Sequence, residues 1–262
     1  MEVKNLDFVK VNPAGNMTIL IENLDYEKSN ILKISEILMK EINLYAEQVG
    51  FIKGNHLQMM GGEFCGNASR SFASLLAFRD KNFKEQKNYF ITCSGEENIL
   101  EVDIRKTEKV NQFLAKIRMP EYLKINKLEI LDEEKEIYKF TLVEFAGIHH
   151  FIYQDRTTKE KIINLLKTYM EDKKYSAFGI MFFNKLNFSM IPYVAVKGFE
   201  EGIWENSCAS GTTALAYYLK KFENIEKAKI YQPAGWLEFS FLGNDVYIDG
   251  PVEIVAEGKV YI

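Results

Sequence analysis

The sequence has few cysteines, no excess of positive charge and no long hydrophobic run. Only three cysteines, Cys65, Cys93 and Cys208, occur among 262 residues. This number excludes a disulfide framework, and a reducing compartment is expected. Lys and Arg number 33 against 37 Asp and Glu, which leaves a formal net charge of −4. Without a basic excess to neutralise phosphates, no nucleic-acid partner is expected.

Hydrophobic runs are too short to cross a membrane. The longest, such as Ala177–Phe183, are far shorter than the roughly 18 residues that a membrane-spanning helix needs. The opening residues, MEVKNLDFVK, contain no apolar segment of the signal-peptide type. We therefore expect no membrane partner and a cytoplasmic location. The composition, 47% hydrophobic and 27% charged, is that of an ordinary globular protein.

Short β-rich segments outnumber helical ones. Helical periodicity is clearest in Leu32–Ile42, in Lys161–Met170 and in the segments that follow Cys65 and Cys208. Strands are expected at Val3–Val11, Met17–Glu22, Tyr89–Cys93, Ile99–Ile104, Gln112–Arg118, Lys139–Glu144, His150–Tyr153, Gly179–Phe183, Ser189–Val196, Lys229–Gln232, Leu237–Phe241, Val246–Asp249 and Val252–Val260. Because the helices do not alternate regularly with the strands, the predicted class is α+β and not a doubly wound α/β fold.

One charged segment divides the chain. Met119–Glu136 contains Pro120 and a dense run of charges, and two interpretations of it are open. It is either the crossing between two lobes or a solvated surface loop with a short helix. We expect an N-terminal lobe over residues 1–124 and a C-terminal lobe over residues 125–262, each with one of the outer cysteines. The last strand crossing back to the first lobe is an alternative.

A weak internal repeat begins at two of the cysteines. Cys65-Gly66-Asn67-Ala68 opens one segment, and Cys208-Ala209-Ser210-Gly211 opens another. Apolar residues follow at matching positions that share one helix face. They are Phe72, Leu75 and Leu76 in the first segment and Leu215, Tyr218 and Leu219 in the second. A half-chain duplication with one cysteine per half would produce this pattern.

A cysteine at a helix start has a chemistry of its own. The first turn of a helix carries unpartnered N–H groups and about half a positive charge, which favour a thiolate and can bind a carboxylate. Two such thiols facing each other across one cleft would exchange protons at a chiral carbon. One removes the hydrogen from Cα, the other delivers a proton to the opposite face, and the centre is inverted. The helix N-termini would stabilise the charge that spreads onto the carboxylate.

This scheme requires neither pyridoxal phosphate nor a metal, and we expect no cofactor. The sequence has no evident lysine or phosphate-binding signature for pyridoxal phosphate. Zinc is disfavoured because no C-x-x-C or H-x₃₋₅-H spacing occurs. His149 and His150 would point to opposite faces of a strand, so they could not easily share one ion. Cys93, inside an expected strand, is interpreted as a core residue.

Five short motifs resemble the diaminopimelate epimerase superfamily of cofactor-independent racemases. They are Asn12-Pro13-Ala14-Gly15-Asn16, Gln48-Val49-Gly50-Phe51, Glu63-Phe64-Cys65-Gly66-Asn67-Ala68, His150-Phe151-Ile152 and Cys208-Ala209-Ser210-Gly211-Thr212. They occur in the family order over nearly the whole chain, so the resemblance to the superfamily is specific.

Within that superfamily the sequence is most similar to the histidine racemases that supply D-histidine for opine-type metallophores. The strings NPAGNMTIL, EQVGFI, GGEFCGNA, IWENSCASGT and QPAG carry this resemblance. True diaminopimelate epimerases have Gly-Asn-Asp-Phe where this chain has Gly15-Asn16-Met17-Thr18. Where they have an arginine before the second cysteine, this chain has Trp204-Glu205-Asn206-Ser207. Loss of that cationic clamp favours a substrate without a second carboxylate head.

The resemblance implies two pseudo-symmetric lobes, each a mostly antiparallel sheet wrapped around a central helix, with the active site between them. It implies that Cys65 and Cys208 are the catalytic acid/base pair, supported by His150 and Glu205. The implied substrate-binding residues are Asn16, Glu47, Gly66, Asn67, Asn206, Ala209 and Ser210.

Two of these roles have an equally simple alternative. Glu47 would accept a hydrogen bond from an imidazole N–H, or it is a solvated glutamate at a helix end. His150 would tune or relay a proton of one cysteine, or it is a half-buried strand histidine.

The leading hypothesis is a racemase that interconverts L- and D-histidine, with a small amino acid as its substrate. An epimerase of diaminopimelate or of another diamino diacid is the near alternative. A different class is a thiol redox or binding module in which Cys65 and Cys208 form a switchable disulfide. A cysteine hydrolase would leave the second cysteine helix unexplained. The oligomeric state is open, with a homodimer among the alternatives.

Overall fold

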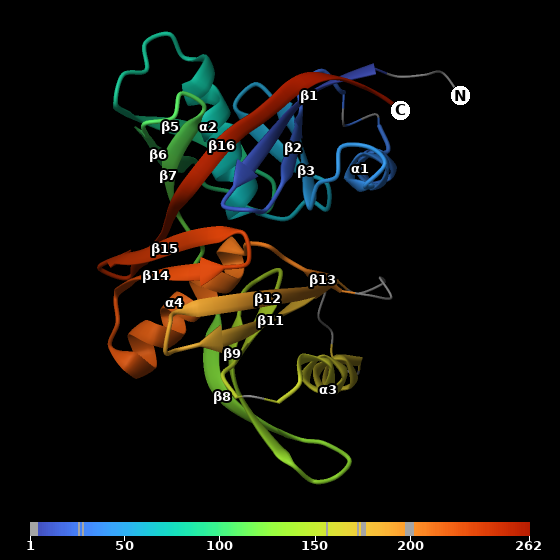
Figure 1. The fold of residues 1–262 in the computed structure, drawn as a ribbon, viewed down its shortest axis with the longest axis vertical. Helices are drawn as coiled ribbons and strands as arrows, with labels where there is room; N and C mark the ends of the chain where they lie inside the picture. Colours follow the sequence, from blue (N-terminus) through green and yellow to red (C-terminus); the bar gives the residue numbers. More distant parts are fainter. Residues whose placement is uncertain are drawn as a thin grey trace. The chain divides into compact units, whose positions relative to one another are not determined.

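The computed structural model describes residues 5–25, 27, 29–155, 157–171, 173, 177–196 and 202–262. The chain forms two compact units, one of Met1–Arg118 with Tyr247–Ile262 and the other of Met119–Val246. Strands dominate both units (Figure 1). The α+β class and the two-lobed architecture are therefore confirmed.

The first unit is a closed ring of strands. In ring order these are β1 (Asn5–Pro13), β2 (Thr18–Ile21), β3 (Gln48–Lys53), β4 (His56–Met59), β5 (Gln86–Cys93), β6 (Leu100–Lys106), β7 (Gln112–Arg118) and β16 (Asp245–Tyr261). β16 pairs with β7 and also with β1, which closes the ring. The β2–β3 and β4–β5 pairs are parallel, and the other pairs are antiparallel.

Helix α2 (Gly66–Arg79) is the central element of this unit. It contacts β1, β2, β3, β5, β6 and β7, and every residue from Gly66 to Leu75 is buried. A helix buried on all sides has no polar outer stripe, and its small alanines and serines allow strands to pack around it. The second helix of the unit, α1 (Ile31–Met39), packs against β3, with Ile34 and Leu38 in a core shared with that strand.

The second unit is a mixed sheet with a helix on each face. Its strand order is β15 (Gly235–Leu242), β14 (Lys227–Gln232), β12 (Ser189–Val196), β11 (Ala177–Asn184), β10 (His149–Tyr153), β9 (Ile137–Glu144) and β8 (Lys124–Leu131), and β13 (Ile203–Trp204) pairs with β12. Helix α4 (Ala209–Glu223) contacts β9, β10, β11 and β15. Helix α3 (Lys159–Glu171) shares a core with residues of the sheet.

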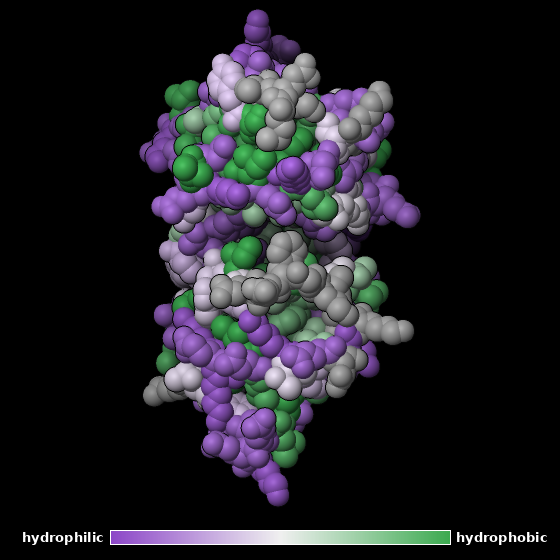
Figure 2. All heavy atoms as spheres, turned by 90° about the vertical axis from the view of Figure 1, so that its right-hand side faces the viewer, coloured by the Kyte–Doolittle hydropathy of each residue, from purple (hydrophilic) through white to green (hydrophobic). Residues whose placement is uncertain are grey.

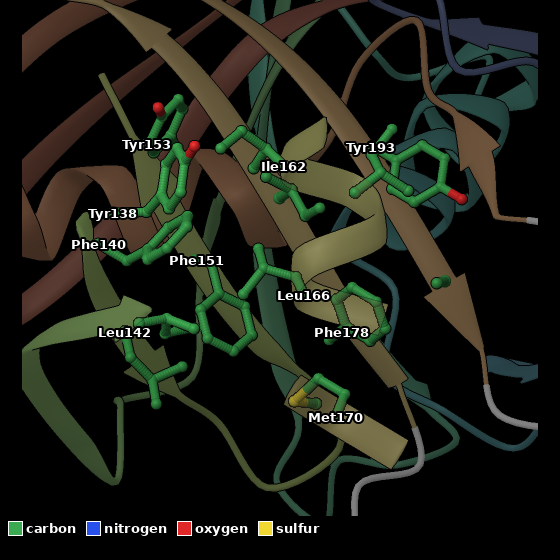
Figure 3. Close-up of a cluster of buried hydrophobic side chains, with 14 residues drawn as sticks. Tyr138, Phe140, Leu142, Phe151, Tyr153, Ile162, Leu166, Met170, Phe178 and Tyr193 are labelled. Carbon is green, nitrogen blue, oxygen red and sulfur yellow. The ribbon is translucent and has the colours of Figure 1, made fainter. Parts of the chain in front are cut away.

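The core under α3 shows which side chains of the sheet face which helix. Phe151 of β10 and Phe178 of β11 lie against Leu166 and Met170 of α3 (Figure 3). Because neighbouring side chains of a strand point to opposite faces, His150 of β10 lies on the other face, which α4 covers. This alternation places His150 on the same side of the sheet as the helix that begins after Cys208.

One of the two interpretations of the charged segment, the surface loop with a short helix, is wrong. Met119–Glu136 does not contain a helix, because its residues Lys124–Leu131 form β8, which pairs antiparallel with β9. Only Ile125 and Ile130 of β8 are buried, so the charged outer face conceals the alternation in the sequence.

Other bounds differ in smaller ways. Strands β3, β4 and β13 were not expected, and the two final expected strands are the single strand β16. Ile42 lies beyond the end of α1 and is 94% exposed. Of the expected strand Val3–Val11, residues 3 and 4 lie outside the described residues.

The surface is mostly hydrophilic on the face that Figure 2 shows, with hydrophobic side chains in separate groups. Among the helices in the described part of the chain, none is both long and apolar enough to span a membrane.

Candidate active site

Cys65 is the residue at which α2 begins. It has an extended backbone (φ −130°, ψ 111°), and its Sγ accepts a hydrogen bond from the backbone N–H of Ala68 at 3.4 Å. Its carbonyl accepts the first helical hydrogen bond, from the N–H of Ser69. A side chain that accepts from the first turn is an N-cap, and here the acceptor is sulfur. The helix-start cysteine predicted from the sequence is therefore present in the first unit.

A chain of polar side chains leads away from Cys65. The thiol donates to Gln48 Oε1 at 2.9 Å, and Gln48 Nε2 donates to Thr18 Oγ1 at 2.7 Å. Thr18 Oγ1 in turn donates to the backbone carbonyl of Asn16 at 3.1 Å. Because each member holds the next, the orientation of the Gln48 amide beside the thiol is determined by buried neighbours.

Asn16 and Glu47, both predicted from the sequence, are joined directly. Asn16 Nδ2 donates to Glu47 Oε2 at 2.8 Å, and the backbone N–H of Glu47 donates to the carbonyl of Met17 at 2.8 Å. Asn16 is 3% exposed, and its Oδ1 has no hydrogen-bond partner among the described residues. Glu47 thus directs the amide of Asn16 so that an unpaired acceptor remains. We use the name first half-site for the polar residues around Cys65 within the first unit, which are Asn16, Glu47, Gln48, Cys65 and its neighbour on α2, Asn67.

Cys208 begins α4 in nearly the same way. Its backbone is extended (φ −125°, ψ 111°), and its Sγ accepts from the N–H of Gly211 at 3.3 Å. Ser210 Oγ lies 3.4 Å from the same sulfur. The repeat seen in the sequence therefore corresponds to two cysteine-capped helices of matching geometry, one in each unit.

The electrostatic surroundings of Cys208 favour its protonated form. Burial raises the pKa of the Cys208 thiol well above its usual value, and the hydrogen-bonded carboxylate of Glu205 raises it further. Hydrogen bonds from Ser210 and Gly211 act in the opposite direction. Cys208 is 4% exposed, so a low dielectric strengthens each of these effects.

Gln232 anchors the start of α4. Its Oε1 accepts from the backbone N–H of Cys208 at 2.8 Å, and its Nε2 donates to Thr212 Oγ1 at 3.0 Å. Two residues later, the N–H of Ala234 donates to the carbonyl of Asn206 at 3.3 Å. The QPAG segment noted in the sequence therefore holds the turn that carries the second cysteine. We define the second half-site as Glu205, Cys208, Ser210 and Gln232.

His150 is fully buried, with neither ring nitrogen hydrogen-bonded within the described part of the chain. Burial, with a smaller contribution from His149, lowers the pKa of its imidazole to about 3. The ring packs against Gly179, where an added Cβ would lie 2.4 Å from Nδ1. His150 is therefore a neutral imidazole at physiological pH, and it is not hydrogen-bonded to Cys208.

Three further predicted residues lie at the first residue of α2, at the first residue of α4, or in the turn before α4. Asn206 is exposed and meets the QPAG segment through its backbone carbonyl. Gly66 and Ala209 are buried as the first residues of α2 and α4. Because neither Gly66 nor Ala209 has a large side chain, a carboxylate could approach the first backbone amides of either helix.

The sequence-based selection missed Gln48 and Gln232 as site residues. Each glutamine is hydrogen-bonded to one of the helix-capping cysteines. Both lie in strings that carried the family resemblance, but neither belongs to a residue type that signals acid/base chemistry. A systematic comparison of the polar residues in those strings could have identified them.

One group of carboxylates within the described ranges has the spacing of a metal site. It consists of Asp132, Glu134 and Glu136 near the β8–β9 turn. Lys161 Nζ already lies 3.0, 3.6 and 2.9 Å from oxygens of these three residues. Lys161 thus supplies positive charge to the three carboxylates, which are not residues of either half-site.

Comparison with known proteins relates this arrangement to one family. A family model described as the histidine racemase CntK N-terminal domain matches residues 5–261. The chain is 63% identical over its whole length, and over 99% of the relative's length, to a histidine racemase of Fusobacterium nucleatum. It is 27% identical to the histidine racemase of Staphylococcus aureus, covering 98% of each chain.

Solved structures share the fold at much lower identity. A hydroxyproline epimerase from Agrobacterium vitis superposes with a TM-score of 0.70 at 9% identity, covering 100% of this chain and 92% of the other. A likeness at this identity establishes the architecture only. The family model and the Fusobacterium relative extend over nearly the whole chain, so this protein is a member of the histidine racemase family of isomerases.

Proposed function

We propose that this protein interconverts L- and D-histidine by proton exchange between Cα and two cysteines, Cys65 and Cys208. The observation that carries the proposal is the pair of helix-capping cysteines with matching backbone geometry. Identity of 63% to a histidine racemase over the whole chain supports histidine as the substrate. The proposal includes that Cys65 and Cys208 approach opposite faces of one substrate carbon.

In this mechanism each cysteine alternates between base and acid. The thiolate of one cysteine takes the proton from Cα and becomes a thiol, and the C–H electron pair stays on the substrate as an enolate-like carbanion. The thiol of the other cysteine then donates its proton to the opposite face and becomes the thiolate. Backbone N–H groups at Gly66, Asn67, Ala209 and Ser210 would stabilise the charge that develops on the carboxylate.

The polar groups of each half-site suit both protonation states of their cysteine. Gln48 accepts from the thiol of Cys65, and Glu205 accepts from the thiol of Cys208. The N–H groups of Ala68 and Gly211 donate to the same sulfurs and stabilise the thiolates. Asn16, whose Oδ1 is unpaired, would accept from the substrate ammonium group.

The test is an exchange assay with a panel of amino acids. The purified protein, without added cofactor, is incubated with L-histidine in heavy water. We expect loss of the Cα proton by NMR and appearance of D-histidine by chiral chromatography. Diaminopimelate, proline and lysine serve as comparison substrates. Absence of exchange with histidine would exclude the proposed substrate, and preferential exchange with diaminopimelate would favour the epimerase alternative.

Variants of the cysteines test the mechanism. Cys65→Ser and Cys208→Ser should each lower racemisation by about 10²–10⁴-fold, the usual size of an acid/base contribution. Cys93→Ser is the matched control, because it makes the same substitution at a buried cysteine and keeps an acceptor for the backbone N–H of Cys65. It should leave most activity. Wild-type rates in Cys65→Ser or Cys208→Ser would exclude the two-cysteine mechanism.

Two further sequence-based expectations stay predictions. The domain boundary at 124/125 can be tested by limited proteolysis, and the homodimer by sedimentation analysis of the purified protein.

A further inference from the structure

Arg70 is a charged side chain enclosed by the strands of the first unit. It lies on α2, is 0% exposed, and is the largest fully buried side chain of the chain's described part. Its Nε and Nη1 have no hydrogen-bond partner among the described residues. A buried ion with incompletely paired donors opposes folding. Departures of this kind from ordinary packing are concentrated at functional sites.

The guanidinium reaches back to the helix end that carries Cys65. Helix side chains tilt toward the N-terminus, and Arg70 Nη2 donates to Asn67 Oδ1 at 3.3 Å. Asn67 lies in the first turn of α2, immediately after the capping cysteine. A thiolate at Cys65 and the carboxylate of Asp249 both counteract the effect of burial, which lowers the pKa of Arg70 to about 10. Arg70 is therefore charged at neutral pH.

Two described groups that are hydrogen-bonded to Cys65 carry no positive charge. Gln48, at the start of β3, is neutral and accepts from the thiol. Cys93, at the end of β5, accepts a hydrogen bond from the backbone of Cys65, and burial raises the pKa of its thiol, so it is uncharged.

Carboxylates also interact with the neighbours of Cys65, and a negative charge disfavours a thiolate. Glu63, in the turn before α2, acts on the adjacent Cys93 as a negative charge. Glu47, next to β3, is hydrogen-bonded to Asn16. On β16, the carboxylate of Asp249 binds Arg105 and acts on Arg70.

The second half-site has the opposite electrostatic character. The charged group beside Cys208 is the carboxylate of Glu205, which favours the thiol. The two cysteines cap their helices with matching geometry. The charged group near Cys65 is the buried cation Arg70, whereas the one near Cys208 is the anion Glu205.

We propose that Arg70 is a positioning residue of the first half-site, whose enclosed positive charge stabilises the thiolate of Cys65 and whose hydrogen bond orients the Asn67 amide. That Arg70 contributes to catalysis rests on the proposed function. Its effect on the ionisation of Cys65 can be measured without a substrate. Cys65 should therefore ionise at a lower pH than Cys208.

The experiment measures alkylation of each cysteine by iodoacetamide as a function of pH. The folded full-length protein is alkylated first, and mass spectrometry of its peptides after digestion then quantifies the modification of each cysteine. Only the thiolate reacts, so the midpoint reports ionisation. Arg70→Met should raise the Cys65 midpoint by about one pH unit, a tenfold loss of thiolate at neutral pH. Arg70→Lys, which keeps the charge, should leave the Cys65 midpoint close to the wild-type value. Cys208 is the internal control and should keep its midpoint.

A purely structural arginine would lower the melting temperature without moving the Cys65 midpoint. A folded Arg70→Met protein with the wild-type midpoint at Cys65 therefore overturns the proposal. Asp249→Asn is a second variant that leaves α2 unchanged. It removes a negative charge near the guanidinium, so the Cys65 midpoint should fall, and an unchanged or higher midpoint contradicts the proposal.

The two proposals fail in different ways. If the midpoints shift as expected but histidine does not exchange its Cα proton, the proposed function is wrong and the role of Arg70 in thiolate stabilisation remains. If histidine is racemised but Arg70→Met leaves the Cys65 midpoint unchanged, only the inference about Arg70 is wrong.

Discussion

The buried imidazole of His150 should make the protein sensitive to mild acid. The ring is 0% exposed, and burial lowers its pKa to about 3 from an ordinary value of 6.5. A histidine whose folded pKa is depressed stabilises the fold fully only above its unfolded pKa. That stability is lost as the pH falls from 6.5 toward 3.

The size of the effect follows from the two pKa values. At pH 5 the unfolded chain has bound a proton that the folded protein excludes, which costs about 2 kcal/mol at about 1.4 kcal/mol per pH unit below 6.5. Such a loss is a large part of the 5–15 kcal/mol typical of domain stability. Carboxylates with lowered pKa values, such as Asp132 and Glu136, also contribute in acid, so a variant is needed to isolate the histidine.

His150→Leu is that variant, because neither ring nitrogen has a hydrogen bond to lose in the described part of the structure. Urea denaturation of both proteins at pH 7 and pH 5 measures the free energy of unfolding. The variant should differ little from the wild type at pH 7, and it should lose about 2 kcal/mol less on acidification. Equal losses in both proteins would show that His150 does not exclude a proton, and the buried neutral imidazole would be the wrong description.

Two other substitutions test the second half-site. Gly211→Ala would place a Cβ 2.2 Å from Met181 Sδ and 3.2 Å from Cys208 Sγ, so the histidine exchange rate should fall at least about tenfold while overpacking costs about 1–3 kcal/mol of stability. Gly147→Ala, whose added Cβ has no atom within 4 Å among the described residues other than its chain neighbours, should preserve both the rate and the melting temperature. Glu205→Gln removes a negative charge that raises the pKa of Cys208, so iodoacetamide should alkylate Cys208 at a lower pH. An unchanged Cys208 profile would exclude Glu205 as a cause of the raised pKa.

Local patterns in the sequence predicted much of the secondary structure. The small residues after Cys65 and Cys208 indicated two helix starts, and both cysteines cap helices. The bounds of β7 and β12 agree with the expected Gln112–Arg118 and Ser189–Val196. Where the period was obscured, two interpretations stayed open, and the one with a short helix was wrong. The charges of Lys124–Leu131 concealed β8, because an edge strand buries few of its side chains.

The residues of the candidate site also differ in how far they could be predicted from the sequence. Cys65, Cys208 and the small residues after them were identifiable because capping depends on residues close in sequence. Gln48 and Gln232 were not, because their bonds to the cysteines connect separate elements.

The sequence by itself determined the class of fold, the family and the two cysteine-capped helices, because composition, periodicity and motifs are properties of neighbouring residues. Only the tertiary structure decided the electrostatic environment of each half-site. The ring closed by β16 encloses Arg70 of the first cysteine helix, and the turn after β13 places Glu205 beside Cys208. Burial and charge separation depend on contacts between residues distant in the chain, and these contacts set the pKa of a thiol.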